Sequence, residues 1–202
     1  MTGASRGIGR AIALGYAEAG ADVAVLARGT QALEQVADLV RRKGRRAAVI
    51  TCDVGDPDRV KAAVSDTVAQ LGRLDVLVHA AGGPGHTGPF LELRDDDWKE
   101  TLRTHLDSTI YLCQAVGRIM VRQGRGSVIT LGAGGMPAPY AAAKAACASL
   151  TRSLAAEWAS TGVRVNTIVP GDLDDVVGAA IYLAGSTGPA TVNLLALGRI
   201  PA

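Results

Sequence analysis

Thr2-Gly3-Ala4-Ser5-Arg6-Gly7-Ile8-Gly9 is the stretch that decides the fold, and it leads directly into the apolar run Ala11-Ile12-Ala13-Leu14. Glycines let a backbone turn tightly and approach a bound group closely, because no Cβ stands in the way. The helix that follows offers unpaired N–H groups and a positive dipole end, which suit a phosphate. Ser5 and Arg6 add a hydroxyl and a charge. The stretch predicts a dinucleotide-binding loop, with an ordinary glycine-rich turn as the alternative.

The composition favours one domain over residues 1–202. The chain is long enough for one well-buried core, and 48% of its residues are hydrophobic while only 3% are aromatic. A net charge of +2, from 21 basic and 19 acidic side chains, gives no general case for nucleic acid or a membrane as partner. The basic cluster at 41–46 is interpreted as a solvated helix end, with a nucleic-acid patch as the alternative.

Three widely spaced cysteines, Cys52, Cys113 and Cys147, form no Cys-x-x-Cys pair. This spacing supports neither a disulfide framework nor a zinc site, so each cysteine is expected to pack as a small apolar residue. The sequence shows no signal peptide and no apolar run as long as a membrane span. We therefore expect a cytoplasmic protein without a metal site.

Short apolar runs alternate with helical stretches along the chain. This alternation predicts an α/β fold with three αβα layers, in which ligands bind beyond the carboxyl ends of parallel strands. Thr30 and Asp56 are expected to cap helices. The predicted strands cover 22–27, 47–51, 74–78, 127–131, 163–169 and 191–197, and the predicted helices cover 7–19, 30–43, 57–71, 95–123, 140–159 and 174–184.

Tyr140-Ala-Ala-Ala-Lys144 is the second informative stretch. Residues four apart share one face of a helix, so the phenol and the ammonium are expected to lie side by side. A neighbouring positive charge favours phenolate, so we expect a lowered pKa for Tyr140 and proton exchange with a carbonyl or alcohol oxygen. The alternative is a surface lysine and a packing tyrosine on an alanine-rich helix.

Five motifs occur in order: Thr-Gly-x3-Gly-x-Gly at the start, Cys52-Asp53-Val54, Ala80-Ala81-Gly82, Tyr-x3-Lys and Pro170-Gly171. Together they resemble the short-chain dehydrogenase/reductase family, in its FabG-like branch of oxoacyl-carrier-protein reductases. The resemblance spans nearly the whole chain. It implies a Rossmann-type doubly wound parallel sheet and an oxidoreductase that interconverts a ketone and a secondary alcohol. It also implies a homodimer or homotetramer that acts on a small-molecule carbonyl or alcohol.

The resemblance also implies a role for each matching position. Tyr140 matches the catalytic acid/base, and Lys144 matches the residue that holds the nicotinamide ribose and lowers the tyrosine pKa. Asp53 and Val54 resemble the pair that contacts adenine. The remaining positions implied in cofactor binding are Gly3, Ser5, Arg6, Gly7, Ile8, Gly9, Ala81, Gly82, Pro170 and Gly171.

Charge indicates which cofactor is preferred. NAD-selective relatives place an aspartate at the end of the second strand, where this chain has Ala27 followed by Arg28. Arg6 lies in the glycine loop. Two guanidinium groups without an acid would suit a 2′-phosphate, so we expect NADP(H) rather than NAD(H). The alternative is that Arg28 is a solvated surface residue.

The chain departs from the family pattern at several places. Gly132 and Ala133 align where the catalytic serine is expected, and Pro170-Gly171 is followed at once by Asp172, so the substrate lid is absent. His105 aligns with the helix asparagine that holds a water in the proton relay. It could act in that relay as a third catalytic residue, or it could simply pack.

Only Met1 precedes the glycine loop, so the family's first strand is also absent from these 202 residues. We expect that the strand, the serine loop and the lid are omitted segments, with a truncated or degenerate gene product as the alternative. An intact mass well above 20.7 kDa would indicate omission. A catalytically inactive nucleotide-binding or interaction protein on the same scaffold is the alternative function.

Overall fold

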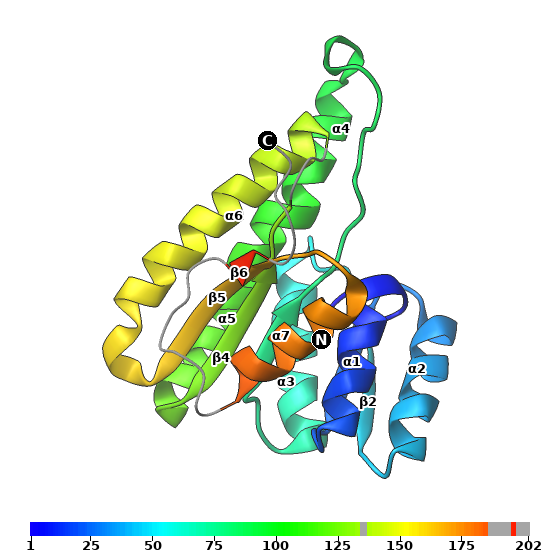
Figure 1. Ribbon diagram of the computed structural model, residues 1–202, viewed down its shortest axis with the longest axis vertical. Helices are drawn as coiled ribbons and strands as arrows, with labels where there is room; N and C mark the ends of the chain where they lie inside the picture. The colour runs from blue at the N-terminus through cyan, green and yellow to red at the C-terminus, as the bar shows by residue number, and fades with distance from the viewer. Residues whose placement is uncertain (134–136, 186–194, 197–202) are drawn as a thin grey trace.

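Strands and helices alternate along the chain in the computed structural model, which describes residues 1–133, 137–185 and 195–196 (Figure 1). The strands are β1 (Val23–Ala27), β2 (Ala47–Thr51), β3 (Val76–His79), β4 (Gly126–Leu131), β5 (Val163–Val169) and β6 (Leu195–Ala196). The α-helices are α1 (Gly7–Glu18), α2 (Thr30–Arg42), α3 (Pro57–Leu71), α4 (Asp95–Leu102), α5 (Ser108–Gln123), α6 (Ala138–Glu157) and α7 (Leu173–Ala184). The α/β prediction is confirmed.

The strand pairs are all parallel, in the orders β1-β2 and β3-β4-β5-β6. Thr2 joins the two parts, because it bridges in parallel to Leu26 of β1 and to His79 of β3. The sheet therefore runs from β2 through β1 and residues 1–2 to β3 and the later strands.

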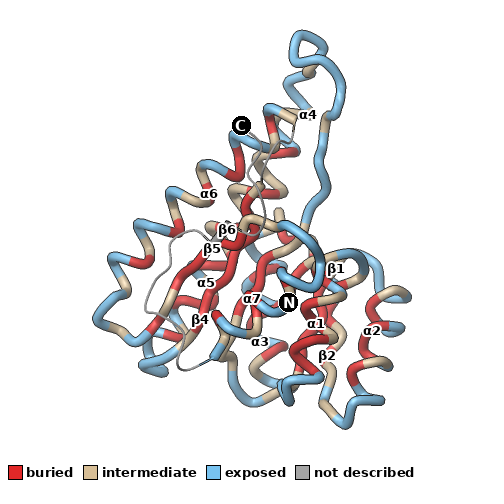
Figure 2. Tube along the Cα trace, in the orientation of Figure 1, coloured by how far each residue is buried: buried red, intermediate tan, exposed pale blue. Residues whose placement is uncertain are grey.

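Helices cover both faces of the sheet, as the three-layer prediction requires. One core lies among α1, α2 and α7, with Ile12, Leu33 and Leu183 among its fully buried side chains. The other lies among α3, α5 and the end of α6, where Met120 and Val60 are fully buried. Figure 2 shows the burial along the strands and on the helix faces turned to the sheet. None of the helices in the described part of the chain is long and apolar enough to cross a bilayer.

Of the two N-cap residues predicted from the sequence, one caps its helix in the structure and the other does not. Asp56 caps α3, accepting hydrogen bonds from the backbone N–H groups of Asp58 and Arg59 at 3.0 and 3.1 Å. The prediction for Thr30 is wrong: Gly29 is the N-cap of α2, and the Thr30 hydroxyl lies 3.0 Å from that of Thr51 instead. The Thr30 hydroxyl therefore contacts a residue at the end of β2 and does not cap α2.

The long helical region predicted at 95–123 is continuous but not uniform. A π-helical turn, Arg103–Asp107, separates α4 from α5. Such turns often mark functional sites, because the extra residue re-aims side chains. Here the turn carries His105, which is buried. Of the predicted last strand, only Leu195–Ala196 belongs to the described residues.

Candidate active site

A large cavity of about 890 Å³ lies at the carboxyl ends of the strands, as expected for a parallel sheet. It extends from the glycine loop to the start of α6. Nearly every site residue predicted from the sequence lines it: Gly3, Ser5, Arg6, Gly7, Ile8, Gly9, Arg28, Asp53, Val54, Ala81, Gly82, His105, Tyr140, Lys144 and Pro170. Gly171 is the exception, because it is exposed outside the lining.

The glycine loop has the close backbone packing that its sequence predicts. A Cβ at Gly3 would lie 2.4 Å from the carbonyl oxygen of Ala80, and Gly3 has a φ of +66°. A Cβ at Gly9 would lie 2.2 Å from the carbonyl oxygen of Gly3. No side chain caps the N-terminus of α1. Its first N–H groups therefore face the cavity without an intrahelical acceptor, which is the arrangement that binds phosphate.

Asp53 is held in place by two donors. Its carboxylate accepts from the N–H of Gly55 at 3.0 Å and from the guanidinium of Arg103 at 3.1 Å. Desolvation acts to raise the pKa of Asp53, but these hydrogen bonds outweigh it and the pKa lies below its usual value. Asp53 is therefore ionised and fixed in orientation at the cavity edge.

Arg103 is a site residue that the sequence reasoning missed. It forms a two-point ion pair with Glu100, through Nε at 2.7 Å and Nη2 at 2.9 Å, and its third contact is Asp53. Its position three residues after Glu100 on a helix was the only available signal. The link to Asp53 spans fifty positions of sequence and could not be inferred from spacing.

Arg6 and Arg28 both line the cavity, and both are exposed. Arg28 follows the last residue of β1, Ala27, which also lines the cavity. The end of β1 thus presents a guanidinium and no carboxylate. Asp53, which also lines the cavity, is paired with Arg103.

Tyr140 and Lys144 lie side by side on α6, as their spacing predicted. The Lys144 Nζ is 5.5 Å from the centre of the Tyr140 ring. The predicted pKa effect is wrong for this structure: burial raises the pKa of Tyr140, and the charge on Cys147 adds to the rise. Burial also lowers the pKa of Lys144. Burial is thus the first cause of the pKa shift of both groups.

His105 completes a cluster with Tyr140. The two rings meet edge to face with centroids 4.8 Å apart. His105 Nε2 lies 2.8 Å from the carbonyl oxygen of Gly83, so Nε2 carries the proton and Nδ1 is an acceptor. Nδ1 is buried and has no hydrogen-bond partner among the described residues. Burial, with the charge of Lys144, lowers the pKa of His105 to about 4, so the ring is neutral at neutral pH.

Gly82 determines where the His105 ring can lie. A Cβ at Gly82 would meet His105 Cε1 at 2.1 Å, and the φ of Gly82 is +113°. Only glycine adopts this conformation without strain and leaves room for the ring. The glycine after β3 therefore lines the cavity and also sets where the His105 ring lies.

Gly132 follows β4 at the position aligned with the catalytic serine. It lines the cavity and donates its N–H to the carbonyl oxygen of Ile168 at 2.7 Å. Gly132 therefore presents only backbone atoms to the cavity and has no side-chain hydroxyl there. Residues 134–136, which follow Ala133, lie outside the described residues. After Pro170, the chain enters α7 directly at Leu173.

Residues 1–181 match the family model described as short chain dehydrogenase. The chain belongs to the short-chain dehydrogenase family. A 3-oxoacyl-[acyl-carrier-protein] reductase of Staphylococcus aureus is 40% identical over 178 residues, covering 85% of this chain and 72% of that protein. A sorbose reductase of Candida albicans is 37% identical over 180 residues. The match covers 85% of this chain but 64% of the sorbose reductase, less than two thirds of its length.

Solved structures of this kind superpose closely on this short-chain dehydrogenase. NAD⁺-bound xylitol dehydrogenase has a TM-score of 0.91 at 26% identity, covering 97% of this chain and 95% of that one. A metagenomic short-chain oxidoreductase in complex with NADP has a TM-score of 0.88 at 30% identity, with coverage of 98% and 96%. Both cofactors thus occur among its structural neighbours.

Proposed function

We propose that this short-chain dehydrogenase is an NADP(H)-dependent oxidoreductase that interconverts a ketone and a secondary alcohol, with Tyr140 as the acid/base. The observation that carries the proposal is the convergence of Tyr140, Lys144 and His105 on the cavity that also contains the glycine loop. A phosphate cradle and a proton-transfer group at two ends of one cavity suit hydride-transfer chemistry.

The residues of the cavity fit a nicotinamide dinucleotide. The cradle of Gly3 and Gly9 has no room for a Cβ, and the N-terminus of α1 supplies N–H donors for a pyrophosphate. Asp53 would hold the adenine end, and Lys144 would hold the ribose beside Tyr140. When bound, the cofactor supplies or accepts the hydride.

Tyr140 carries the proton in this scheme. With its pKa raised by burial, the phenol keeps its proton at neutral pH and can donate it to a carbonyl oxygen as hydride arrives at carbon. The bare Nδ1 of His105, next to the ring, is the acceptor through which a water could exchange protons with the site. Because the imidazole is neutral, Nδ1 can accept a hydrogen bond without placing a positive charge beside Tyr140.

The first experiment follows the loss of reduced-nicotinamide absorbance with NADPH and a panel of ketones. Turnover of any ketone supports the proposal. Gly132, which has no hydroxyl where the family has one, favours a second candidate: an inactive nucleotide-binding protein on the same scaffold. NADPH binding in a fluorescence titration, with no turnover across the panel, would favour that candidate.

Cofactor preference is tested by the ratio of the two affinities. We expect NADPH to bind more tightly than NADH, and Arg28→Ala to reduce that ratio about tenfold or more, because one charge-assisted contact to a 2′-phosphate is lost. Arg42→Ala, at the opposite end of α2, is the matched control and should leave the ratio unchanged. Tighter binding of NADH by the wild-type chain would overturn the NADP(H) assignment.

A further inference from the structure

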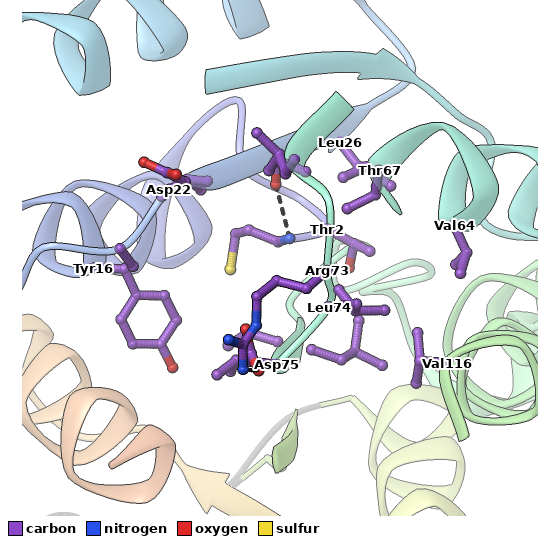
Figure 3. A pocket seen from close by; sticks show the side chains of 18 of the residues that line it. Thr2, Tyr16, Asp22, Leu26, Val64, Thr67, Arg73, Leu74, Asp75 and Val116 are labelled. Carbon is purple, nitrogen blue, oxygen red and sulfur yellow. Dashed lines mark hydrogen bonds and ion pairs between the residues drawn. The ribbon is translucent and has the colours of Figure 1, made fainter. Parts of the chain in front are cut away.

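His79 is the last residue of β3, and its side chain is buried outside the active-site cavity. Both ring nitrogens have partners. Nδ1 lies 2.7 Å from the hydroxyl oxygen of Thr2, and Nε2 lies 2.8 Å from the hydroxyl oxygen of Ser108. Thr2 lies between β1 and β3, in the wall of a second cavity of about 270 Å³ that Figure 3 shows. Ser108 is the first residue of α5. The imidazole therefore connects the start of the glycine loop to the start of α5.

The hydrogen positions along these contacts follow from the number of hydrogens available. The Ser108 hydroxyl has one hydrogen, which it donates to the carbonyl of Thr104 at 2.6 Å, with a longer contact of 3.4 Å to the carbonyl of His105. Towards His79 this hydroxyl therefore accepts, so Nε2 carries the proton and Nδ1 is bare. The Thr2 hydroxyl then donates to Nδ1. The hydroxyl and imidazole hydrogens thus all point in one direction, from Thr2 to Thr104.

This arrangement requires a neutral imidazole, which has one donor and one acceptor nitrogen. Burial lowers the pKa of His79 well below its usual value, and the charge of Lys144 adds to the lowering. The ring is therefore neutral at neutral pH. A protonated ring would present two donors and could not accept from the Thr2 hydroxyl.

Ser108 supplies two donors to the π turn at Arg103–Asp107. In an α-helix, its N–H would donate to the carbonyl four residues back, which is that of Thr104. Here the N–H donates to the carbonyl of Arg103, five residues back. The Ser108 hydroxyl takes the vacated place at the Thr104 carbonyl. The side chain thus replaces the backbone bond that the π turn removes, which a buried carbonyl requires.

The next carbonyl of the turn, that of His105, is also bonded to side chains. The Thr109 hydroxyl donates to it at 2.6 Å, and the Cys147 thiol donates to it at 3.3 Å. Cys147 lies on α6, three residues after Lys144. The π turn is therefore attached to α6 as well as to the end of β3.

The direction of the His105 side chain depends on this turn. Each residue of an α-helix advances the chain by about 100°, so an α-helical turn in place of the π turn would rotate His105 by about that angle relative to α5. The ring would then leave its edge-to-face contact with Tyr140, at 4.8 Å between centroids. It would also leave the carbonyl of Gly83, which lies 2.8 Å from Nε2.

We propose that His79 and Ser108 are positioning residues for the reaction, which hold the π turn in the geometry that places His105 against Tyr140. Neither residue lines the active-site cavity, so both act through His105. This inference rests on the proposed function, because the position of His105 affects a rate only where Tyr140 transfers a proton.

Ser108→Ala tests the turn with a small change. Without the hydroxyl, the Thr104 carbonyl loses its donor and the N–H of residue 108 can return to it. Ketone reduction with NADPH should fall about tenfold to a hundredfold, because His105 moves, while NADPH affinity changes little. His79→Leu should give the same result. His79→Gln, whose side-chain amide places an N–H near the position of Nε2, should keep most of the wild-type rate. Unchanged turnover in Ser108→Ala would overturn the proposal.

Thr67→Val is the matched control. Thr67 is buried in α3, and its hydroxyl donates to the carbonyl four residues back, that of Ala63, at 2.8 Å. The substitution removes the same kind of bond, but from a helix without a π turn. It should lower the Tm as Ser108→Ala does and leave turnover unchanged. An equal fall in turnover in both variants would show that Ser108 acts only through stability, against the positioning role.

NMR spectroscopy gives readouts that do not depend on activity. Long-range ¹H–¹⁵N spectra should show that His79 is protonated at Nε2 and bare at Nδ1. Nuclear Overhauser contacts between the rings of His105 and Tyr140 should be present in the wild-type chain and in His79→Gln, and absent from Ser108→Ala. The opposite tautomer of His79, or ring contacts that persist in Ser108→Ala, would contradict the inference.

These spectra also separate this inference from the proposed function. If the wild-type chain reduces no ketone, the proposed function fails, and the ring contacts alone decide whether His79 and Ser108 hold the turn. If Ser108→Ala does not fold, His79→Leu and His79→Gln are compared by the same two measurements. Ring contacts in His79→Gln alone would support the inference, and ring contacts in both would overturn it.

Discussion

At the scale of single residues, the cavity depends on close backbone packing at glycines and on buried titratable groups such as Tyr140. Gly3 and Gly9 lie where their spacing placed them, because the need for a missing Cβ is encoded by residue type alone. The pKa of Tyr140 was predicted in the wrong direction, because it depends on burial by residues from other elements. Arg103 was missed for the same reason: its partner Asp53 is distant in sequence.

Gly82→Ala should abolish most activity. The new Cβ would meet His105 Cε1 at 2.1 Å and force a left-handed backbone on alanine, so the ring must move and the loop is strained. We expect turnover to fall at least tenfold and unfolding free energy to drop by about 1–3 kcal/mol. Steady-state kinetics and thermal melts check both.

Gly178→Ala is the control for that substitution. Gly178 is an exposed residue inside α7 whose Cβ would meet nothing within 4 Å. Alanine there should leave turnover unchanged and stabilise the helix by roughly 0.5–1 kcal/mol. Full activity of Gly82→Ala would show that the His105 position is not important for the reaction.

Acidification should destabilise the protein through its buried histidines. Burial lowers the pKa of His105 to about 4 and that of His79 well below its usual value. Between pH 6.5 and about 4 the unfolded chain binds protons that the native chain does not, so stability is complete above pH 6.5 and falls as the pH falls. For His105 the loss is on the order of 3 kcal/mol.

His105→Asn isolates one histidine's contribution to this pH dependence. Denaturant unfolding at several pH values should show a shallower fall in stability for the variant than for the wild-type chain, because asparagine does not titrate. Parallel curves for the two proteins would contradict the burial argument for His105.

At the scale of elements, local sequence patterns predicted the helices and strands. Contacts with residues distant in sequence determine details at their ends that those patterns did not predict. The Asp56-Pro57 signal was sufficient to place the start of α3, because the cap is made within four residues. Thr30 failed as a cap because Thr51, on the neighbouring strand, engages its hydroxyl. The π turn at Arg103–Asp107 had no sequence signal, since its pattern is that of an ordinary helix.

Asp56→Ala should destabilise the protein by about 1 kcal/mol, because the carboxylate accepts two orphan N–H groups of α3. Asp56→Asn keeps the acceptor oxygen, so its loss of stability should be only a few tenths of the loss in Asp56→Ala. Chemical denaturation measures both. Equal losses for the two substitutions would show that charge, and not capping, is the source of the effect.

At the scale of the whole molecule, we expect self-association through the long helices. α6 spans 20 residues, and its outward face carries the small exposed residues Ala141, Ala142 and Ala145. Such a face allows close packing against a second copy. Light scattering should give two or four times the mass of the 20.7 kDa chain, and Ala145→Glu should reduce it. A wild-type monomer at micromolar concentration would contradict this expectation.

The order of motifs along the chain made the overall fold predictable, since strand–helix alternation leaves few topologies. The junction at Met1 and Thr2 was not predictable in the same way. Only the structure shows that Thr2 bridges to both halves of the sheet, at Leu26 and at His79. Long-range pairing of that kind has no local signature.

Replacement of the Tyr140 hydroxyl tests the central claim most directly. In Tyr140→Phe, NADPH-dependent ketone reduction should fall at least a thousandfold while NADPH affinity, measured by fluorescence titration, changes little, because only the proton donor is removed. Tyr182→Phe, on the exposed side of α7, should retain wild-type rates. Reduction by Tyr140→Phe at the wild-type rate would contradict the account.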